Sequence, residues 1–224
     1  MNYRIAYSIG FHPWEDAATD PPFVNKFQEL IDREESGRSR PFGAALDLGT
    51  GSGIWGIELA RRGWQVTGID IVDKALERAR ERLRRASLDM QLIKGDVTAL
   101  RDSGIGTGYR LVLDTGTFHD FDPTRQQAMG REIDAIAAPD ATVLLLVWPK
   151  RVRPLIRGAT RDEIQAAFPG WMITHVEASH FRLPKVMEMI LRPDECWYRL
   201  RRAGPNNSSS RSRFAARLHS GVSR

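Results

Sequence analysis

Four acidic residues and a run of glycines carry the chemistry that this sequence can do. The stretch from Asp47 to Gly56 reads Asp-Leu-Gly-Thr-Gly-Ser-Gly-Ile-Trp-Gly and continues a short apolar run that begins at Ala44. Glycines allow a sharp turn and a close approach of a ligand to the backbone. A helix that starts after the turn supplies free N–H groups and the positive end of a dipole. The pattern is therefore typical of a nucleotide site.

The acidic residue before the first glycine indicates which ligand the turn suits. Residues 51–56 also satisfy the G-x-G-x-x-G pattern of dinucleotide-binding folds. A carboxylate at Asp47 would repel a pyrophosphate resting on the turn, but it would attract an ammonium or a sulfonium. The turn is therefore better suited to S-adenosylmethionine than to NAD. An NAD(P)-dependent oxidoreductase remains an alternative.

Residues 45–53 resemble motif I of the class I S-adenosylmethionine-dependent methyltransferases, whose pattern is acidic-x-Gly-x-Gly-x-Gly. The resemblance extends over about residues 42–202 and implies S-adenosylmethionine as the cofactor. The predicted cofactor-binding residues lie in the turn and at the ends of predicted strands. They are Asp47, Gly49, Thr50, Gly51, Gly53, Asp70, Ile71, Asp96, Val97, Asp114 and Thr115.

Two of these acids follow the second and third predicted strands. Asp70 is placed to accept hydrogen bonds from ribose hydroxyls, and a helix N-cap is the alternative reading. In the resembling family, an acid at the position of Asp96 bonds the adenine amino group, and the next residue packs on the ring. A carboxylate suits an amino group because that group is a donor. An ordinary turn aspartate is the alternative for Asp96.

The segment after the fourth predicted strand should lie beside the transferred methyl group, because open α/β sheets bind ligands beyond the carboxyl ends of their strands. In the resembling family this segment, residues 114–121, matches motif IV. His119 is the candidate general base because imidazole titrates in the useful range, and Asp114 is the second catalytic candidate. A packing or loop role is the alternative for His119. The predicted substrate-binding residues are Phe11, Trp14, Phe118, His119 and Trp148.

The acceptor is predicted to be a small molecule that is methylated on sulfur, oxygen or nitrogen. The Asn-Pro-Pro-Tyr signature of adenine or glutamine methylation is replaced here by residues 114–117, Asp-Thr-Gly-Thr. The Pro13-Trp14-Glu15 stretch is similar to an arm found in methyltransferases of thiols, halides and heterocyclic compounds. Its aromatic residues either line a substrate pocket, together with Glu15, or anchor the arm to the core. A methyltransferase acting on RNA or protein is the alternative function.

The charge distribution and the cysteine content indicate which partners and which cellular setting to expect. The chain of 224 residues has a net charge of +5, but residues 203–224 hold four arginines and no acid, which leaves about +1 for the body. This distribution argues against nucleic-acid binding through the folded domain. Cys196 is the single cysteine, so no internal disulfide forms, and we expect a reducing, cytoplasmic setting. No apolar run reaches membrane-spanning length, and the histidines show no metal-ligand spacing.

The order of predicted elements indicates an α/β fold: a Rossmann-like, doubly wound, seven-stranded sheet, mostly parallel, with helices on both faces and the last strand antiparallel. Strands are predicted at residues 44–48, 65–71, 90–94, 109–113, 141–148, 171–176 and 195–201. Helices are predicted between them, including one over residues 73–86 and one that opens at the Thr160–Glu163 capping box. We expect residues 1–40 to cover the site, residues 41–202 to bind the cofactor and residues 203–224 to be a disordered basic tail.

Overall fold

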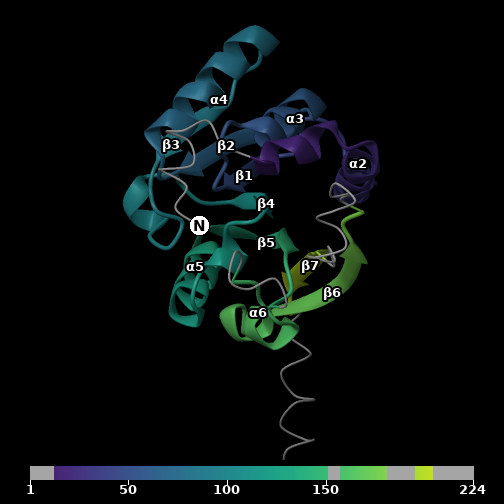
Figure 1. Ribbon diagram of the computed structural model, residues 1–224, viewed down its shortest axis with the longest axis vertical. Helices are drawn as coiled ribbons and strands as arrows, with labels where there is room; N and C mark the ends of the chain where they lie inside the picture. The colour runs from purple at the N-terminus through teal and green to yellow at the C-terminus, as the bar shows by residue number, and fades with distance from the viewer. Residues whose placement is uncertain (1–12, 151–156, 181–194, 204–224) are drawn as a thin grey trace, which may run out of the picture.

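The computed structural model describes residues 13–150, 157–180 and 195–203 and is organised around one seven-stranded sheet (Figure 1). The strands are hydrogen-bonded in the order β3-β2-β1-β4-β5-β7-β6. They span β1 (Ala44–Leu48), β2 (Gln65–Asp70), β3 (Gln91–Lys94), β4 (Tyr109–Asp114), β5 (Ala137–Val147), β6 (Trp171–Ala178) and β7 (Cys196–Arg202). Strand β7 runs antiparallel to both of its neighbours, and the other pairs are parallel. The predicted fold class is confirmed.

Helices cover both faces of this sheet. They are η1 (Pro13–Thr19), α2 (Pro21–Glu35), α3 (Ile54–Arg62), α4 (Asp73–Ala86), η2 (Arg101–Ser103), η3 (Phe118–Asp120), α5 (Pro123–Ile136) and α6 (Arg161–Ala167). The predicted helix over residues 73–86 and the capping box of Thr160 and Glu163 are both confirmed. Asp20 occupies the N-cap position of α2, but its side chain accepts no capping hydrogen bond from that helix.

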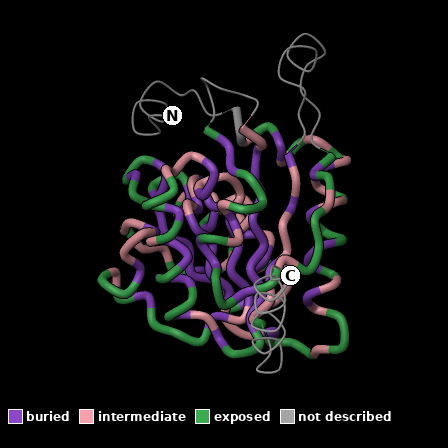
Figure 2. Tube along the Cα trace, turned by 90° about the horizontal axis from the view of Figure 1, so that it is seen from below, coloured by how far each residue is buried: buried purple, intermediate pink, exposed green. Residues whose placement is uncertain are grey.

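Successive side chains of the central strands point to opposite faces of the sheet, so the core forms two layers. In β4, Leu111 and Leu113 pack with α2 and α3, whereas Val112 faces α5 and α6. Strand β5 divides in the same way, with Leu144 and Val143 on opposite faces. A strand buried on both faces reads as a continuous apolar run, and the buried trace through the middle of Figure 2 follows these strands.

The chain reverses direction across the sheet between β1 and β4. Strands β2 and β3 lie on one side of β1, whereas β4 lies on its other side. Because open α/β sheets bind ligands where the strand order reverses, the ends of β1 and β4 mark the expected site. Asp47 in β1 is paired with Leu113 of β4, and Leu48 is paired with Asp114.

Strand β5 starts earlier than predicted. We expected it at residue 141, because Pro139-Asp140 is typical of a turn. Instead, Ala137 follows α5 directly and pairs with Tyr109, and the register shifts between Tyr109 and Leu111. The irregularity absorbs Pro139, whose lack of an N–H is tolerated where the ladder is interrupted. The other predicted strand ends agree within two residues.

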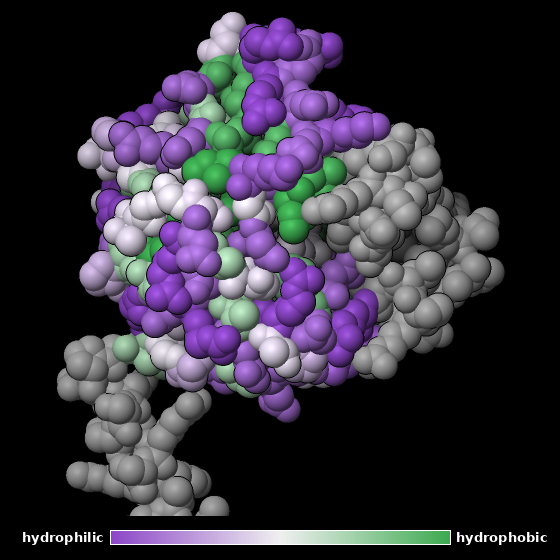
Figure 3. All heavy atoms as spheres, turned by 90° about the vertical axis from the view of Figure 1, so that its left-hand side faces the viewer, coloured by the Kyte–Doolittle hydropathy of each residue, from purple (hydrophilic) through white to green (hydrophobic). Residues whose placement is uncertain are grey.

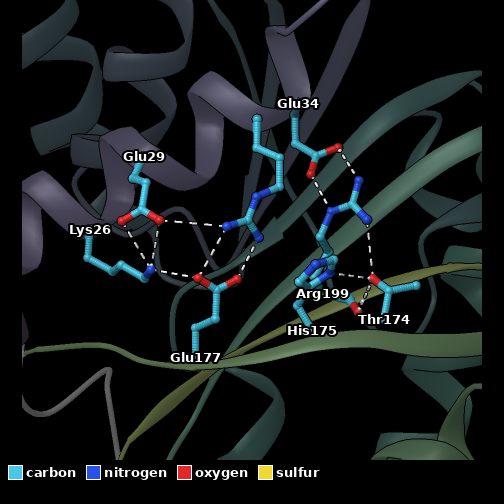
Figure 4. A network of polar contacts seen from close by, with 8 residues as sticks. Lys26, Glu29, Glu34, Thr174, His175, Glu177 and Arg199 are labelled. Atoms are coloured by element: carbon cyan, nitrogen blue, oxygen red, sulfur yellow. Dashed lines mark hydrogen bonds and ion pairs between the residues drawn. The ribbon is translucent and has the colours of Figure 1, made fainter.

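Polar contacts fasten helix α2 to the antiparallel end of the sheet (Figure 4). Arg199 of β7 donates to both carboxylate oxygens of Glu34, at 2.5 and 3.1 Å, and Thr142 donates to Glu34 at 2.7 Å. Glu34 is 4% exposed. Nearer the sheet edge, Lys26 and Arg33 both donate to Glu177 of β6. Two carboxylates from different elements therefore orient α2 over the sheet.

Helix α4 presents a hydrophilic outer face at the top of Figure 3. Glu81 accepts hydrogen bonds from Arg84 and Arg85, so oppositely charged side chains are paired on this exposed face. None of the helices in the described ranges is both long enough and apolar enough to cross a membrane.

Candidate functional site

The glycine turn joins β1 to α3 and is fixed by bonds to the neighbouring strand. Gly49, Gly51 and Gly53 all have positive φ, at 62°, 56° and 79°. The Thr50 N–H donates to the Ile69 carbonyl at 3.0 Å, and the Gly53 N–H donates to the Thr50 carbonyl at 2.8 Å. A left-handed backbone suits glycine, so the spacing of the glycines follows from the path of the turn.

Asp47 lies beneath this turn and is 1% exposed. Its Oδ2 accepts a hydrogen bond from the Thr50 hydroxyl at 2.6 Å. Within the described part of the chain, Oδ1 has no hydrogen-bond partner. Burial, with the nearby charges of Asp114 and Asp70, raises the pKa of Asp47 to about 7. The contacts with Thr50 and the Gly56 backbone oppose this rise in pKa. A buried oxygen without a partner is costly, and a cationic ligand group here would supply one.

Asp70 closes the turn from the end of β2. Its Oδ2 accepts from the Gly51 N–H and its Oδ1 accepts from the Val72 N–H, both at 2.8 Å. Burial raises the pKa of Asp70 above the usual value and outweighs these bonds, which lower it. The next residue, Ile71, is 43% exposed at this edge of the sheet. An acceptor beside an exposed apolar side chain suits a nucleoside, whose ribose is polar and whose base is flat.

Asp96 follows β3 and is already engaged. Its Oδ1 accepts from the backbone and hydroxyl of Thr98, and its Oδ2 accepts from Arg125 at 3.4 Å. Burial alone would raise the pKa of Asp96, but the Thr98 bonds and the Arg125 charge lower it. The guanidinium of Arg125 lies 3.9 Å from the ring centre of Phe121. Val97 is 5% exposed and belongs to the core beneath. Adenine contacts of Asp96 and Val97 stay predictions.

Asp114 organises the loop after β4. Its Oδ1 accepts from the N–H groups of Gly116 and Thr117, at 2.7 and 2.9 Å, and its Oδ2 accepts from the Phe118 N–H at 3.0 Å. The side chain is fully buried, and burial raises its pKa to about 7. These bonds make Asp114 the anchor of the loop that leads into η3. Thr115, half-buried, lies in the same loop. A catalytic role for Asp114 stays a prediction.

His119 extends the hydrogen-bond ladder of β5 beyond the end of β4. Its Nδ1 lies 3.3 Å from the Leu146 carbonyl oxygen and 3.5 Å from the Trp148 backbone N. In a parallel sheet, one residue of a neighbouring strand would form hydrogen bonds with both of these backbone groups. The ring is 5% exposed, and burial lowers the pKa of His119, so the imidazole is neutral at pH 7. Its role as a base stays a prediction.

The predicted substrate-binding residues fall into different surroundings. Phe118 is fully buried and packs against Phe168, with ring centres 5.9 Å apart. Trp148 is 8% exposed and is a hydrogen-bond partner of the buried Glu195. Phe11 lies outside the described residues, and the Trp14 side chain is likewise not described. Substrate contact by all four stays a prediction, and contact with Phe118 would require its core surroundings to open.

Several residues of the site were not predicted as such. Thr117 Oγ1 donates to the Leu48 carbonyl at 3.5 Å, which joins the loop after β4 to the glycine turn. Ser52 of the turn accepts a hydrogen bond from Arg82 of α4. Glu15, for which pocket lining was one of two alternatives, accepts a hydrogen bond from that same arginine. The spacing of Arg82 signals only a solvated helix face, so its contacts depend on the tertiary structure.

One protein-family model matches the part of the chain that carries this candidate site. Residues 45–140 match the family model described as "Methyltransferase domain". These residues form a methyltransferase domain. The matched segment holds the glycine turn together with Asp70, Asp96 and Asp114. The match supports the resemblance to class I S-adenosylmethionine-dependent methyltransferases over this segment, which is less than half of the chain.

Solved structures share the fold of the whole methyltransferase domain. Magnesium protoporphyrin IX methyltransferase from Synechocystis PCC 6803, with bound S-adenosylmethionine, is 18% identical, with a TM-score of 0.69 over 90% of this chain and 95% of its own. The N-methyltransferase NodS from Bradyrhizobium japonicum WM9, in complex with S-adenosylhomocysteine, is 15% identical, with a TM-score of 0.65 over 82% and 88%. Likeness at these identities establishes a shared fold.

A curated relative matches over a shorter length. Ribosomal RNA small subunit methyltransferase C from Alcanivorax borkumensis is 35% identical over 78 residues, which cover 35% of this chain and 23% of that protein. The chain therefore matches about a quarter of the length of this relative. Their shared segment supports the domain assignment and leaves the acceptor to be argued from the site.

Proposed function

We propose that this chain is an S-adenosylmethionine-dependent methyltransferase that transfers a methyl group to a sulfur, oxygen or nitrogen atom of a small molecule. The observation that carries the proposal is Asp47 Oδ1, which has no hydrogen-bond partner among the residues that the structure describes and is buried under a turn of three glycines with positive φ. This arrangement suits a ligand with a cationic amino-acid end. Asp70 and the exposed Ile71 suit the nucleoside end of the same ligand.

The sulfonium cofactor supplies an already activated methyl group, so the protein mainly positions the acceptor and excludes water. Asp47 and the turn hold the amino-acid end, and Asp70, Ile71 and Asp96 hold the nucleoside. Asp114 fixes the loop that faces the turn through three backbone bonds. In the tautomer that donates Nδ1–H to the Leu146 carbonyl, His119 carries on Nε2 the lone pair that can take a proton from the acceptor.

Binding and transfer assays test the proposal. Calorimetric titration of the full chain with S-adenosylhomocysteine should show one site, and NADH and NADPH should not bind. Labelled S-adenosylmethionine is then incubated with a panel of small thiols, phenols and amines. Label in at least one product supports the proposal. Binding of NADH without binding of S-adenosylhomocysteine would overturn it in favour of an oxidoreductase.

An RNA acceptor is the second candidate, because the relative from Alcanivorax borkumensis is a ribosomal RNA methyltransferase by name. The nearly neutral body argues for the small molecule. RNA binding of the full chain is compared with that of a chain lacking residues 203–224. Transfer of label to ribosomal RNA, with no transfer to the small-molecule panel, would replace the first candidate by the second.

A further inference from the structure

Glu15 of η1 contacts two arginines of helix α4. Its Oε2 accepts hydrogen bonds from Arg78 Nη2 at 3.3 Å and from Arg82 Nη2 at 3.2 Å. The Glu15 side chain is 13% exposed, whereas the two arginine side chains are 42% and 41% exposed. A largely covered carboxylate thus faces two half-exposed cations on neighbouring turns of one helix.

Arg82 also reaches the glycine turn. The Nη2 atom that donates to Glu15 lies 3.3 Å from Ser52 Oγ. Ser52 is 2% exposed and stands between Gly51 and Gly53 in the turn. One guanidinium therefore connects the segment before α2 to the backbone that we propose to hold the cofactor.

Ser52 is held differently from its neighbours in the turn. The N–H groups of Thr50, Gly51 and Gly53 bond to β2 or to the turn itself. The Ser52 side chain is held by α4, an element that packs outside the turn. A change at Arg82 therefore acts on the turn without removing any of the turn's own backbone bonds.

Element η1 also packs against α2, with Ala17 in the cluster that holds Phe23 and Phe27. It is a seven-residue 3₁₀ helix, a form with poor hydrogen-bond geometry. Of its residues 15–19, whose side chains are described, Ala17 alone is classed as buried. The contacts of Glu15 with Arg78 and Arg82 join η1 to α4.

We infer that Arg82 is a positioning residue for cofactor binding, which ties Ser52 of the glycine turn to Glu15 of η1. This inference rests on the proposed function, since it concerns the turn that holds the cofactor. Docking of η1 and binding of the cofactor favour each other through the shared guanidinium, and such coupling is reciprocal. Because this guanidinium is partly exposed, salt weakens the link.

Arg78 provides a matched control, because it shares the Glu15 contact and lies one turn away on the same helix. Binding of S-adenosylhomocysteine is measured by calorimetry at low and high salt for wild type, Arg82→Gln, Arg82→Lys, Arg78→Gln and Glu15→Gln. We expect Arg82→Gln to weaken binding about three- to tenfold at low salt and Arg78→Gln less than about twofold. Arg82→Lys should recover part of the loss.

Two further readouts separate positioning from general stability. The double variant Glu15→Gln/Arg82→Gln should bind no more weakly than Arg82→Gln alone, because both changes break one link. The salt dependence of binding should be smaller in Arg82→Gln than in wild type. Wild-type affinity in Arg82→Gln, equal losses in the two arginine variants, or additive losses in the double variant would overturn the inference. Failure of the wild type to bind S-adenosylhomocysteine would instead overturn the proposed function and this inference with it.

Discussion

Thr117 lies directly against Gly49: a Cβ added at Gly49 would stand 2.0 Å from Thr117 Oγ1. This contact joins the turn after β1 to the loop after β4, the two segments that flank the reversal of strand order. Gly49 also has a φ of 62°, a conformation that side chains rarely adopt. The first glycine of the motif is therefore required both by its backbone and by its neighbour.

Gly49→Ala should weaken S-adenosylhomocysteine binding by more than about tenfold and lower the free energy of unfolding by about 2 to 4 kcal/mol. Calorimetry and urea unfolding measure the two effects. Adding Thr117→Gly to this variant removes the clash but leaves the backbone strain, so we expect only partial recovery. An alanine variant with wild-type affinity would contradict the role of this contact.

Asp47→Asn should stabilise the ligand-free protein at pH 8. Burial raises the pKa of Asp47 from 3.8 to about 7. Between these values the folded state binds more protons than the unfolded state, so stability falls as pH rises through this range. Asparagine does not titrate, so the variant lacks the part of this loss of stability that comes from Asp47. Urea unfolding at several pH values measures how the free energy of unfolding depends on pH. Part of this dependence should persist in the variant, because burial also raises the pKa of Asp114. An unchanged slope would refute the prediction.

The same carboxylate predicts a pH dependence of cofactor binding. An ammonium beside Oδ1 favours the ionised form of Asp47, so affinity for S-adenosylhomocysteine should rise as pH increases from about 6 to about 8. In Asp47→Asn, binding should be weaker at pH 8, and the rise should flatten. Calorimetry across this range is the measurement. A rise of the same size in the variant would assign it to another group.

Two substitutions separate the roles of His119. Asparagine places a polar atom near the position of Nδ1 but has no counterpart of Nε2, whereas alanine has neither. If Nε2 is the base, both variants should lose about 10²- to 10⁴-fold in turnover on an acceptor found in the panel assay. Asparagine should retain more stability than alanine, because it can still bond Leu146. Normal turnover in the asparagine variant would show that His119 has a structural role, through its contact with the backbone of β5. Affinity for S-adenosylhomocysteine should stay unchanged in both.

Glu34→Ala should lower the free energy of unfolding by about 3 to 5 kcal/mol, because it leaves Arg199 without its buried partner. Glu29→Ala is the matched control on the same helix. The Glu29 side chain is 59% exposed beside Lys26, so its loss should cost less than about 0.5 kcal/mol. Urea unfolding of the two variants measures both effects. Equal costs would contradict the view that the Glu34 pair fastens α2.

Local patterns in the sequence were enough to predict the fold. Apolar runs, caps and glycines placed the seven strands, because each depends on a few adjacent residues. Their order implied the right-handed crossovers and the sheet edge at which Asp47, Asp70 and Asp114 meet. The early start of β5 was missed, since Pro139-Asp140 signals a turn and only pairing with Tyr109 makes it part of a strand.

The sequence by itself determined the glycine turn, the acids at the strand ends and the family, since these features are local in the chain. Only the tertiary structure decided what these groups contact. It left Asp47 Oδ1 without a described partner, committed Asp114 to three backbone amides and set His119 against the edge of β5. It also brought Arg82 to Ser52. Such contacts join residues that are distant in the chain, and they exist only once the sheet and its helices have packed together.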